Sequence, residues 1–174
     1  GGNGADTITG GDGNDTLTGG AGNDVINAGG GTNSVTDAGQ GADAITHNTA
    51  GTVAIDVTGA DAGTLGASVI GASVSVSGAV AGNVNASTSG AGVSMTSTST
   101  AGVVFVGGNA ADTITGGAGN DSIFAGGGND QIIGFVGADT VDGGIGVDTL
   151  VLAGTSADLN GATNERLLNV ETVT

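Results

Sequence analysis

The chain has 174 residues, of which 39 are glycine, three are phenylalanine and none is tryptophan, tyrosine, proline or cysteine, so a conventional core of large side chains is excluded. Seventeen Asp and Glu against a single Lys or Arg give a formal net charge of −16, which leaves no basic surface for nucleic acid or an anionic membrane. Hydrophobic residues, mostly aliphatic, still make up 37% of the chain, too many for simple disorder. The composition predicts β-structure with a thin aliphatic core, tight glycine turns and a cation to neutralise the carboxylates.

Residues 1–46 repeat a unit of nine. Residues 1–9 read GGNGADTIT, residues 10–18 read GGDGNDTLT and residues 19–27 read GGAGNDVIN. Residues 28–36, AGGGTNSVT, keep the register but place Asn33 in the aspartate position. After an inserted Asp37, residues 38–46 read AGQGADAIT. Glycine allows the backbone to turn tightly, and the last three residues of each unit have the pattern of a short strand with its middle residue inward. We therefore expect stacked strand-turn units whose Ile, Leu and Val form one column.

Residues 47–106 lose the aspartates but keep strand-like phrases such as VAIDV, SVSVS and GVVFV. Ile55, Val74 and Val93 recur at a spacing close to one coil of two nine-residue units. This favours a metal-free continuation of the same solenoid, with small aliphatic residues inward and Ser and Thr outward. A separate small β-sandwich is the alternative, because short alternating strands have a similar pattern.

A second block of five units occupies residues 107–151: GGNAADTIT, GGAGNDSIF, AGGGNDQII, GFVGADTVD and GGIGVDTLV. Ala110 replaces a glycine in its first unit. Residues 152–174 depart from the pattern, and we expect a wider coil or cap with Leu159, Leu167 and Leu168 as buried anchors. Glu165 and Arg166 are expected to form a solvated ion pair or a packing contact.

The unit G-G-x-G-x-D-x-U-x, with U a large aliphatic residue, resembles the calcium-binding nonapeptide of the RTX (repeats-in-toxin) family. Among RTX proteins, the chain is most similar to those of bacterial surface layers or adhesins. The resemblance implies an all-β fold, a parallel β-roll or β-solenoid with about nine residues per strand-turn unit and two units per coil. It predicts four parts: a calcium-binding roll at 1–46, a calcium-free continuation at 47–106, a second calcium-binding roll at 107–151, and a wider coil or cap at 152–174.

Stacking would bring aspartates of successive coils together, and carboxylate and carbonyl oxygens are the ligands that calcium prefers. The resemblance implies ions between loops of alternate units, so that Asp24 and Asp130 would each serve two sites, and about five or six Ca²⁺ in all. The predicted carboxylate ligands are Asp6, Asp15, Asp24, Asp43, Asp112, Asp121, Asp130, Asp139 and Asp148, and Asn33 marks a weakened site. The predicted carbonyl ligands, from the first and third loop positions, belong to Gly1, Asn3, Gly10, Asp12, Gly19, Ala21, Gly107, Asn109, Gly116, Ala118, Ala125, Gly127, Gly143 and Ile145.

No catalytic pattern such as G-x-S-x-G or H-E-x-x-H occurs, and His47 is the single histidine, so we expect no enzyme activity and read His47 as a loop or transition residue. No apolar run is long enough to insert into a membrane. Two functions are compatible with the repeats. The first is a structural segment of an extracellular bacterial protein (a surface layer, adhesin or filament) that contacts copies of itself or neighbouring segments. The alternative is the calcium-triggered export and folding module of a type I-secreted enzyme or toxin.

Overall fold

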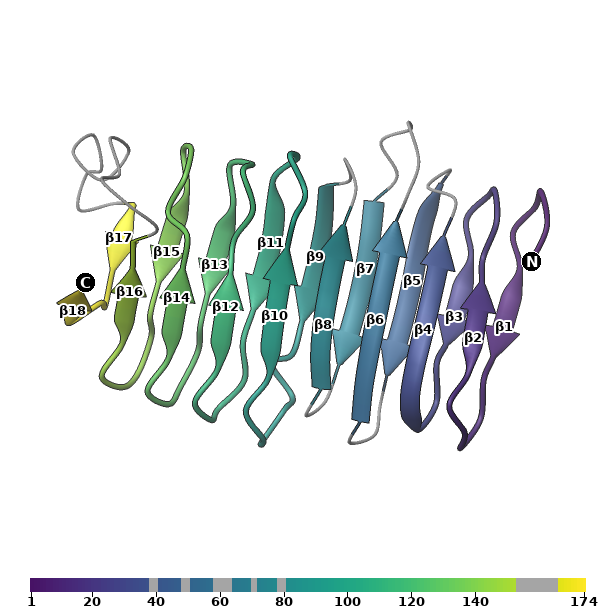
Figure 1. Ribbon diagram of the computed structural model, residues 1–174, viewed down its shortest axis with the longest axis horizontal. Coiled ribbons are helices and arrows are strands. Elements are labelled where there is room, and N and C mark those ends of the chain that lie inside the picture. Colours follow the sequence, from purple (N-terminus) through teal and green to yellow (C-terminus); the bar gives the residue numbers. More distant parts are fainter. Residues whose placement is uncertain (38–40, 48–50, 58–63, 70–71, 78–80, 153–165) are drawn as a thin grey trace.

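The computed structural model describes residues 1–37, 41–47, 51–57, 64–69, 72–77, 81–152 and 166–174. These residues form two parallel sheets of nine strands each, and successive strands alternate between the sheets (Figure 1). The first sheet contains β1 (Thr7–Thr9), β3 (Val25–Asn27), β5 (Ala42–His47), β7 (Thr64–Val69), β9 (Ala81–Asn85), β11 (Val103–Val106), β13 (Ser122–Phe124), β15 (Thr140–Asp142) and β17 (Leu167–Leu168). The second contains β2 (Thr16–Thr18), β4 (Gly31–Asp37), β6 (Gly51–Val57), β8 (Ala72–Ser77), β10 (Ser94–Ser97), β12 (Thr113–Thr115), β14 (Gln131–Ile133), β16 (Thr149–Val151) and β18 (Thr172–Val173).

The predicted parallel β-roll is confirmed. Within the repeat blocks each nine-residue unit supplies one three-residue strand, and two units complete a coil, as in the pairing of Ile8 with Ile26. The middle residue of each block strand faces the opposite sheet, whereas its neighbours are more exposed. The buried residues of this column include Leu17, Ile26, Val35, Ile45, Val53, Val84, Met95, Phe105, Ile114, Ile123, Ile132, Val141 and Leu150. A single aliphatic residue per strand thus becomes a continuous core only through stacking.

Glycine at the second position of most loops permits successive loops to stack, and Phe135 takes this position in the loop of Asp139. Gly20 has a φ of 111°, and a Cβ there would overlap the carbonyl oxygen of Gly2 in the preceding coil. Close backbone approach and positive φ together explain why this position holds glycine. The stacked loops form two edges of the roll (Figure 1).

Strands β6 to β11 extend the same two sheets without interruption in their pairing, so the described residues of the middle form no separate β-sandwich. The regular spacing of Ile55, Val74 and Val93 does not correspond to equivalent positions in successive coils. Val74 pairs with Val53 and Met95, Ile55 pairs with Val76, and Val93 lies just before β10. The reason is that coils in the middle are longer than those of the repeat blocks, so equal spacing in the sequence does not give equal register.

The C-terminal anchors are partly corrected. Leu167 in β17 packs against the core, as predicted, but Leu168 is 43% exposed. Successive residues of a strand point to opposite faces, so both leucines could not be buried in one core. Leu159 and Glu165 lie outside the described residues. The described part of the chain contains no helix capable of crossing a bilayer.

Candidate metal centre

Nine aspartates and Asn33 lie in two rows along the edges of the roll. The turns that lead into odd-numbered strands lie along the upper edge in Figure 1, and those that lead into even-numbered strands lie along the lower edge. We call Asp6, Asp24, Asp43, Asp121 and Asp139 the upper ladder. We call Asp15, Asn33, Asp112, Asp130 and Asp148 the lower ladder. Each ladder has one part in each repeat block, with the middle coils between them.

Backbone hydrogen bonds connect successive rungs of each ladder. In the upper ladder the N–H of Asp6 donates to Oδ1 of Asp24 (2.9 Å), and the N–H of Asp24 donates to Oδ1 of Asp43 (2.9 Å). The N–H of Asp121 donates to Oδ1 of Asp139 (2.8 Å). In the lower ladder the same bond runs from Asp112 to Asp130 and from Asp130 to Asp148, at 2.8 Å each. The structure therefore stacks the carboxylates that the sequence analysis paired.

The second carboxylate oxygens are the unsatisfied atoms of the ladders. Oδ2 of Asp15, Asp24, Asp130 and Asp148 is buried, with no hydrogen-bond partner among the described residues. Asp24, Asp130 and Asp148 are each at most 2% exposed. A buried carboxylate oxygen without a partner is destabilising, so these atoms require a cation or a proton.

First-position glycines leave space beside the Oδ2 atom of several ladder aspartates. A Cβ added to Gly10 would lie 2.6 Å from Oδ2 of Asp15 and 2.7 Å from the carbonyl oxygen of Ala28 in the next coil. At Gly116 the corresponding distances are 2.9 Å to Oδ2 of Asp121 and 3.1 Å to the carbonyl oxygen of Gly134. A carboxylate oxygen and a first-position carbonyl oxygen thus border one small volume that any side chain larger than hydrogen would fill.

This donor set fits calcium, which binds carboxylate and carbonyl oxygens in flexible geometry. In the described residues no three acidic, histidine or cysteine side chains converge, so a site here combines at most two carboxylates with backbone carbonyls. First-position carbonyls of Gly19 and Ala125 lie beside such spaces, at Gly1 and Gly107. The carbonyl of Ile145 instead accepts the N–H of Gly128 at 2.9 Å. Like these three, the carbonyl ligands predicted at Gly1, Asn3, Gly10, Asp12, Ala21, Gly107, Asn109, Gly116, Ala118, Gly127 and Gly143 stay predictions.

A family model of four copies of the RTX calcium-binding nonapeptide repeat matches the chain at residues 1–35, 106–134 and 123–150. The chain carries RTX calcium-binding nonapeptide repeats. The matched ranges coincide with the two ladder-bearing blocks, which RTX repeats identify as a calcium-binding structural segment of a secreted protein. Comparison with curated proteins and with solved structures gave no match.

In one RTX loop the side-chain amide of Asn33 takes the place that a cation would have. Its Oδ1 accepts the N–H of Asp15 (2.9 Å), as an aspartate would. Its Nδ2 donates to the carbonyl oxygens of Ala28 (2.9 Å) and Gly30 (3.2 Å), at the first and third loop positions. The amide group therefore satisfies without metal the carbonyls that the repeat pattern assigns to an ion.

We expect Asn33→Asp to make this loop calcium-dependent. Without calcium the variant loses two hydrogen bonds, about 2 kcal/mol, and places a second carboxylate beside Asp15. With calcium it should bind one more ion than the unmodified chain. Urea unfolding in EDTA and ion counting by native mass spectrometry measure the two effects. Asn14→Asp is the matched control, because it adds the same charge at an exposed loop residue. An Asn33→Asp variant equally stable in EDTA would contradict the assignment.

Burial and mutual repulsion raise the pKa of several RTX aspartates in the metal-free chain. The pKa of Asp130 rises to about 6, mainly through desolvation; the hydrogen bond from the N–H of Asp112 lowers it, and the charges of Asp112 and Asp148 raise it. Desolvation also raises the pKa of Asp112 and Asp139. Burial has the opposite effect on His47, whose pKa it lowers. His47 ends β5, is fully buried, and has no partner for either ring nitrogen among the described residues.

In EDTA, mild acid should favour the folded chain. An aspartate with a raised folded-state pKa binds protons more tightly when folded, so its contribution to stability is present below about pH 4 and is lost as pH rises through about 6. His47 opposes this below about pH 6.5, where the unfolded state gains a proton, but three carboxylates outnumber it. Circular dichroism in EDTA should show more β-structure at pH 5 than at pH 7.5. The Asp130→Asn variant is the control, and it should gain less β-structure between pH 7.5 and pH 5. A loss of β-structure at pH 5 in the unmodified chain would contradict the prediction.

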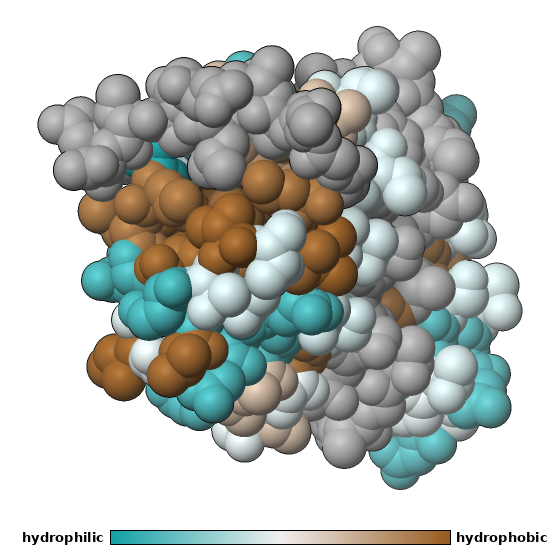
Figure 2. All heavy atoms as spheres, turned by 60° about the vertical axis from the view of Figure 1, so that its left-hand side comes forward, coloured by the Kyte–Doolittle hydropathy of each residue, from teal (hydrophilic) through white to brown (hydrophobic). Residues whose placement is uncertain are grey.

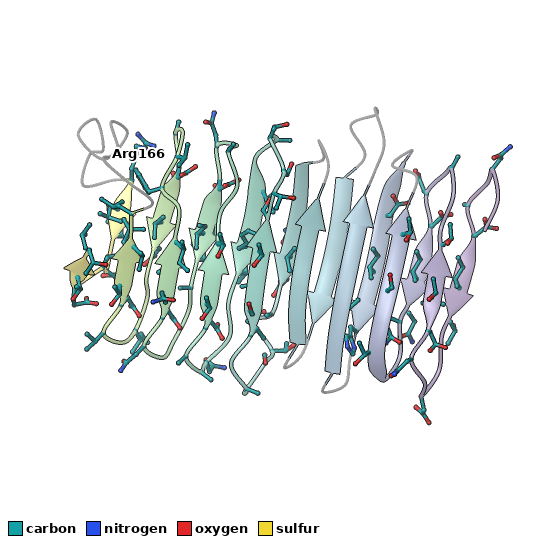
Figure 3. The ribbon with its side chains drawn as sticks, viewed as in Figure 1. Arg166 is labelled. Atoms are coloured by element: carbon teal, nitrogen blue, oxygen red, sulfur yellow. The ribbon has the colours of Figure 1, made fainter. Side chains whose placement is uncertain are left out.

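The single arginine closes the upper ladder at its C-terminal end (Figure 3). Nε of Arg166 donates to the carbonyl oxygen of Asp139 (2.9 Å), and Nη2 donates to that of Gly137 (3.1 Å). The guanidinium carbon lies 5.4 Å from the centroid of the Phe135 ring, in a cation–π arrangement. Arg166 also lowers the pKa of Asp139, although burial raises it more. The sequence analysis foresaw a packing contact but not this cap, whose only sequence signal is the rarity of positive charge.

Proposed function

We propose that this chain is a calcium-dependent structural segment of an extracellular bacterial protein, a surface layer, adhesin or filament. It folds and assembles when it binds Ca²⁺ outside the cell and has no catalytic activity of its own. The supporting observation is the arrangement of both ladders on one pair of continuous sheets, with coils between them that lack the repeat aspartates. A roll of this kind lengthens by addition of coils, which suits a spacer or filament.

The difference in calcium between the two sides of the cell envelope provides the trigger. Inside the cell calcium is scarce, so the orphan carboxylate oxygens and the net charge of −16 oppose folding. Extracellular calcium modules bind with dissociation constants of about 10⁻⁴ to 10⁻³ M, which matches millimolar calcium outside. Ion binding then becomes folding free energy. We propose that type I secretion exports the unfolded chain.

One feature favours assembly with neighbouring segments or copies. The last coils expose apolar side chains, and Figure 2 shows apolar surface on this end of the roll. The exposed side chains there are Val136, Ile145, Val147, Leu168 and Val173.

Light scattering of the full chain before and after millimolar calcium is added tests the proposal. Growth into large particles or filaments is the expected result. Contraction to a compact monomer would instead favour the alternative, an export and folding module. No change from an expanded coil would overturn both. Magnesium at the same concentration is the control, because Mg²⁺ demands stricter octahedral geometry and dehydrates reluctantly.

A further inference from the structure

The last described turn of the chain repeats the ladder pattern in a shortened form. Asn169, Val170 and Glu171 join β17 to β18, whereas the repeat loops have six residues. Residues 171–174 read ETVT, which differs from DTIT of residues 6–9 and 112–115 by a Glu in place of Asp and a Val in place of Ile. The double glycine is missing, so the nonapeptide pattern does not include this turn.

Glu171 continues the hydrogen bonding of the lower ladder. The N–H of Asp148 donates to Oε2 of Glu171 at 2.7 Å. This bond corresponds to those from Asp112 to Asp130 and from Asp130 to Asp148. Glu171 therefore occupies the next rung, and its extra methylene group extends the carboxylate from a turn that is three residues shorter.

Asn169 supplies the carbonyl that a first-position residue supplies elsewhere. A Cβ added to Gly143 would meet the carbonyl oxygen of Asn169 and would lie 2.7 Å from Oδ2 of Asp148. At Gly107 the same space lies between the carbonyl oxygen of Ala125 and Oδ2 of Asp112. Asn169 has a φ of 49°, a left-handed conformation that asparagine tolerates better than most residues. Its side-chain Nδ2 donates to Oδ1 of Asp142 at 2.7 Å, which fixes the turn.

Asp148 provides an independent sign that a ligand is required here. The residue is fully buried, and its Oδ2 has no hydrogen-bond partner among the described residues. This is the oxygen that faces the carbonyl of Asn169 across the space at Gly143. A buried carboxylate oxygen that faces a carbonyl oxygen repels it unless a cation lies between them.

We propose that Asp148 and Glu171, with the carbonyl oxygen of Asn169, bind one further Ca²⁺ at the C-terminal end of the lower ladder, outside the nonapeptide repeats. The donors are of the type that calcium prefers, and two carboxylates neutralise its charge. The site rests on the proposed calcium binding of the repeats and extends it by one ion. It also ties β17 and β18 to the roll, so the last coil orders only when this ion is bound.

Glu171→Gln in the full chain is the decisive variant. Its amide oxygen can still accept the N–H of Asp148, but the negative charge is removed. Native mass spectrometry with calcium should count one ion fewer than in the unmodified chain. The matched control is Asp56→Asn, which removes one charge in β6, outside both repeat blocks. An equal ion count in Glu171→Gln and the unmodified chain would overturn the proposal.

Hydrogen exchange of residues 166–174 provides a second measurement that does not depend on ion counting. In the unmodified chain, calcium should slow exchange in this segment. In Glu171→Gln, calcium should slow exchange only in the repeat blocks, and protection of residues 166–174 equal to that of the unmodified chain would contradict the site. If the unmodified chain binds no calcium at all, the proposed function fails together with this site. If it binds calcium but loses none in the variant, only this site fails.

Discussion

Chelation of calcium at neutral pH is expected to unfold both repeat blocks. The ladders stack buried carboxylates at successive coils, and without the ion the Oδ2 atoms of Asp24, Asp130 and Asp148 have no partner among the described residues. Because the site is assembled only in the folded roll, the free energy of ion binding is also folding free energy. Hydrogen exchange should show that residues 1–37 and 107–151 lose protection in EDTA and regain it when calcium is restored.

High salt without calcium is the control for this experiment. Salt at about 1 M screens exposed charges beyond a Debye length of about 3 Å, but it screens buried carboxylates much less. Sodium chloride should therefore fail to restore protection. Protection of the two blocks that is the same in EDTA and in calcium would mean that the ladders are stable without metal, and the calcium-triggered folding mechanism would be wrong.

Asp130→Asn is expected to raise the calcium concentration needed for folding more than Asp112→Asn does. Asparagine keeps the Oδ1 acceptor of the ladder but removes the charge. Asp130 stacks between Asp112 and Asp148, so it borders two predicted ion sites. Asp112 has Asp130 on one side and Val93 on the other, so it borders one.

At millimolar calcium, a site with a dissociation constant of about 10⁻⁴ M contributes about 1.4 kcal/mol to stability. Asp130→Asn should lose the stabilisation that two such sites contribute, and Asp112→Asn should lose the stabilisation that one site contributes. Circular dichroism during a calcium titration gives both folding midpoints, and Asp24→Asn against Asp6→Asn repeats the comparison in the first block. Equal midpoint shifts for Asp130→Asn and Asp112→Asn would show that ions are not shared between successive rungs.

The repeat blocks could be predicted from the sequence because their period is constant. With two units per coil, the inward residue of each strand stacks on the inward residue two units away, so Ile8 on Ile26 and Ile114 on Ile132 follow from counting. The same counting placed Asp15 beside Asn33. What it did not give was the role of Asn33 Nδ2, which depends on the conformation of its own loop.

Counting residues by the repeat period does not predict the strand register where the coil length changes. In the middle, longer coils shift the register, so Val74 does not pair with Ile55 or Val93. At the end, the three-residue turn before Glu171 lacks the glycines that identify a repeat, although ETVT preserves its strand half. The cap formed by Arg166 joins residues that are distant in the sequence, and no repeat pattern predicts these contacts.

The scarcity of basic residues also determines which proteases can attack the chain. Trypsin-like enzymes cleave after lysine or arginine, and the chain offers them one such bond, after Arg166. The guanidinium group that such a protease must bind is held against Phe135 and two backbone carbonyls. Cleavage there requires the last coil to open first. A secreted protein built from these coils is thereby protected from a major class of extracellular proteases by its composition as well as by its fold.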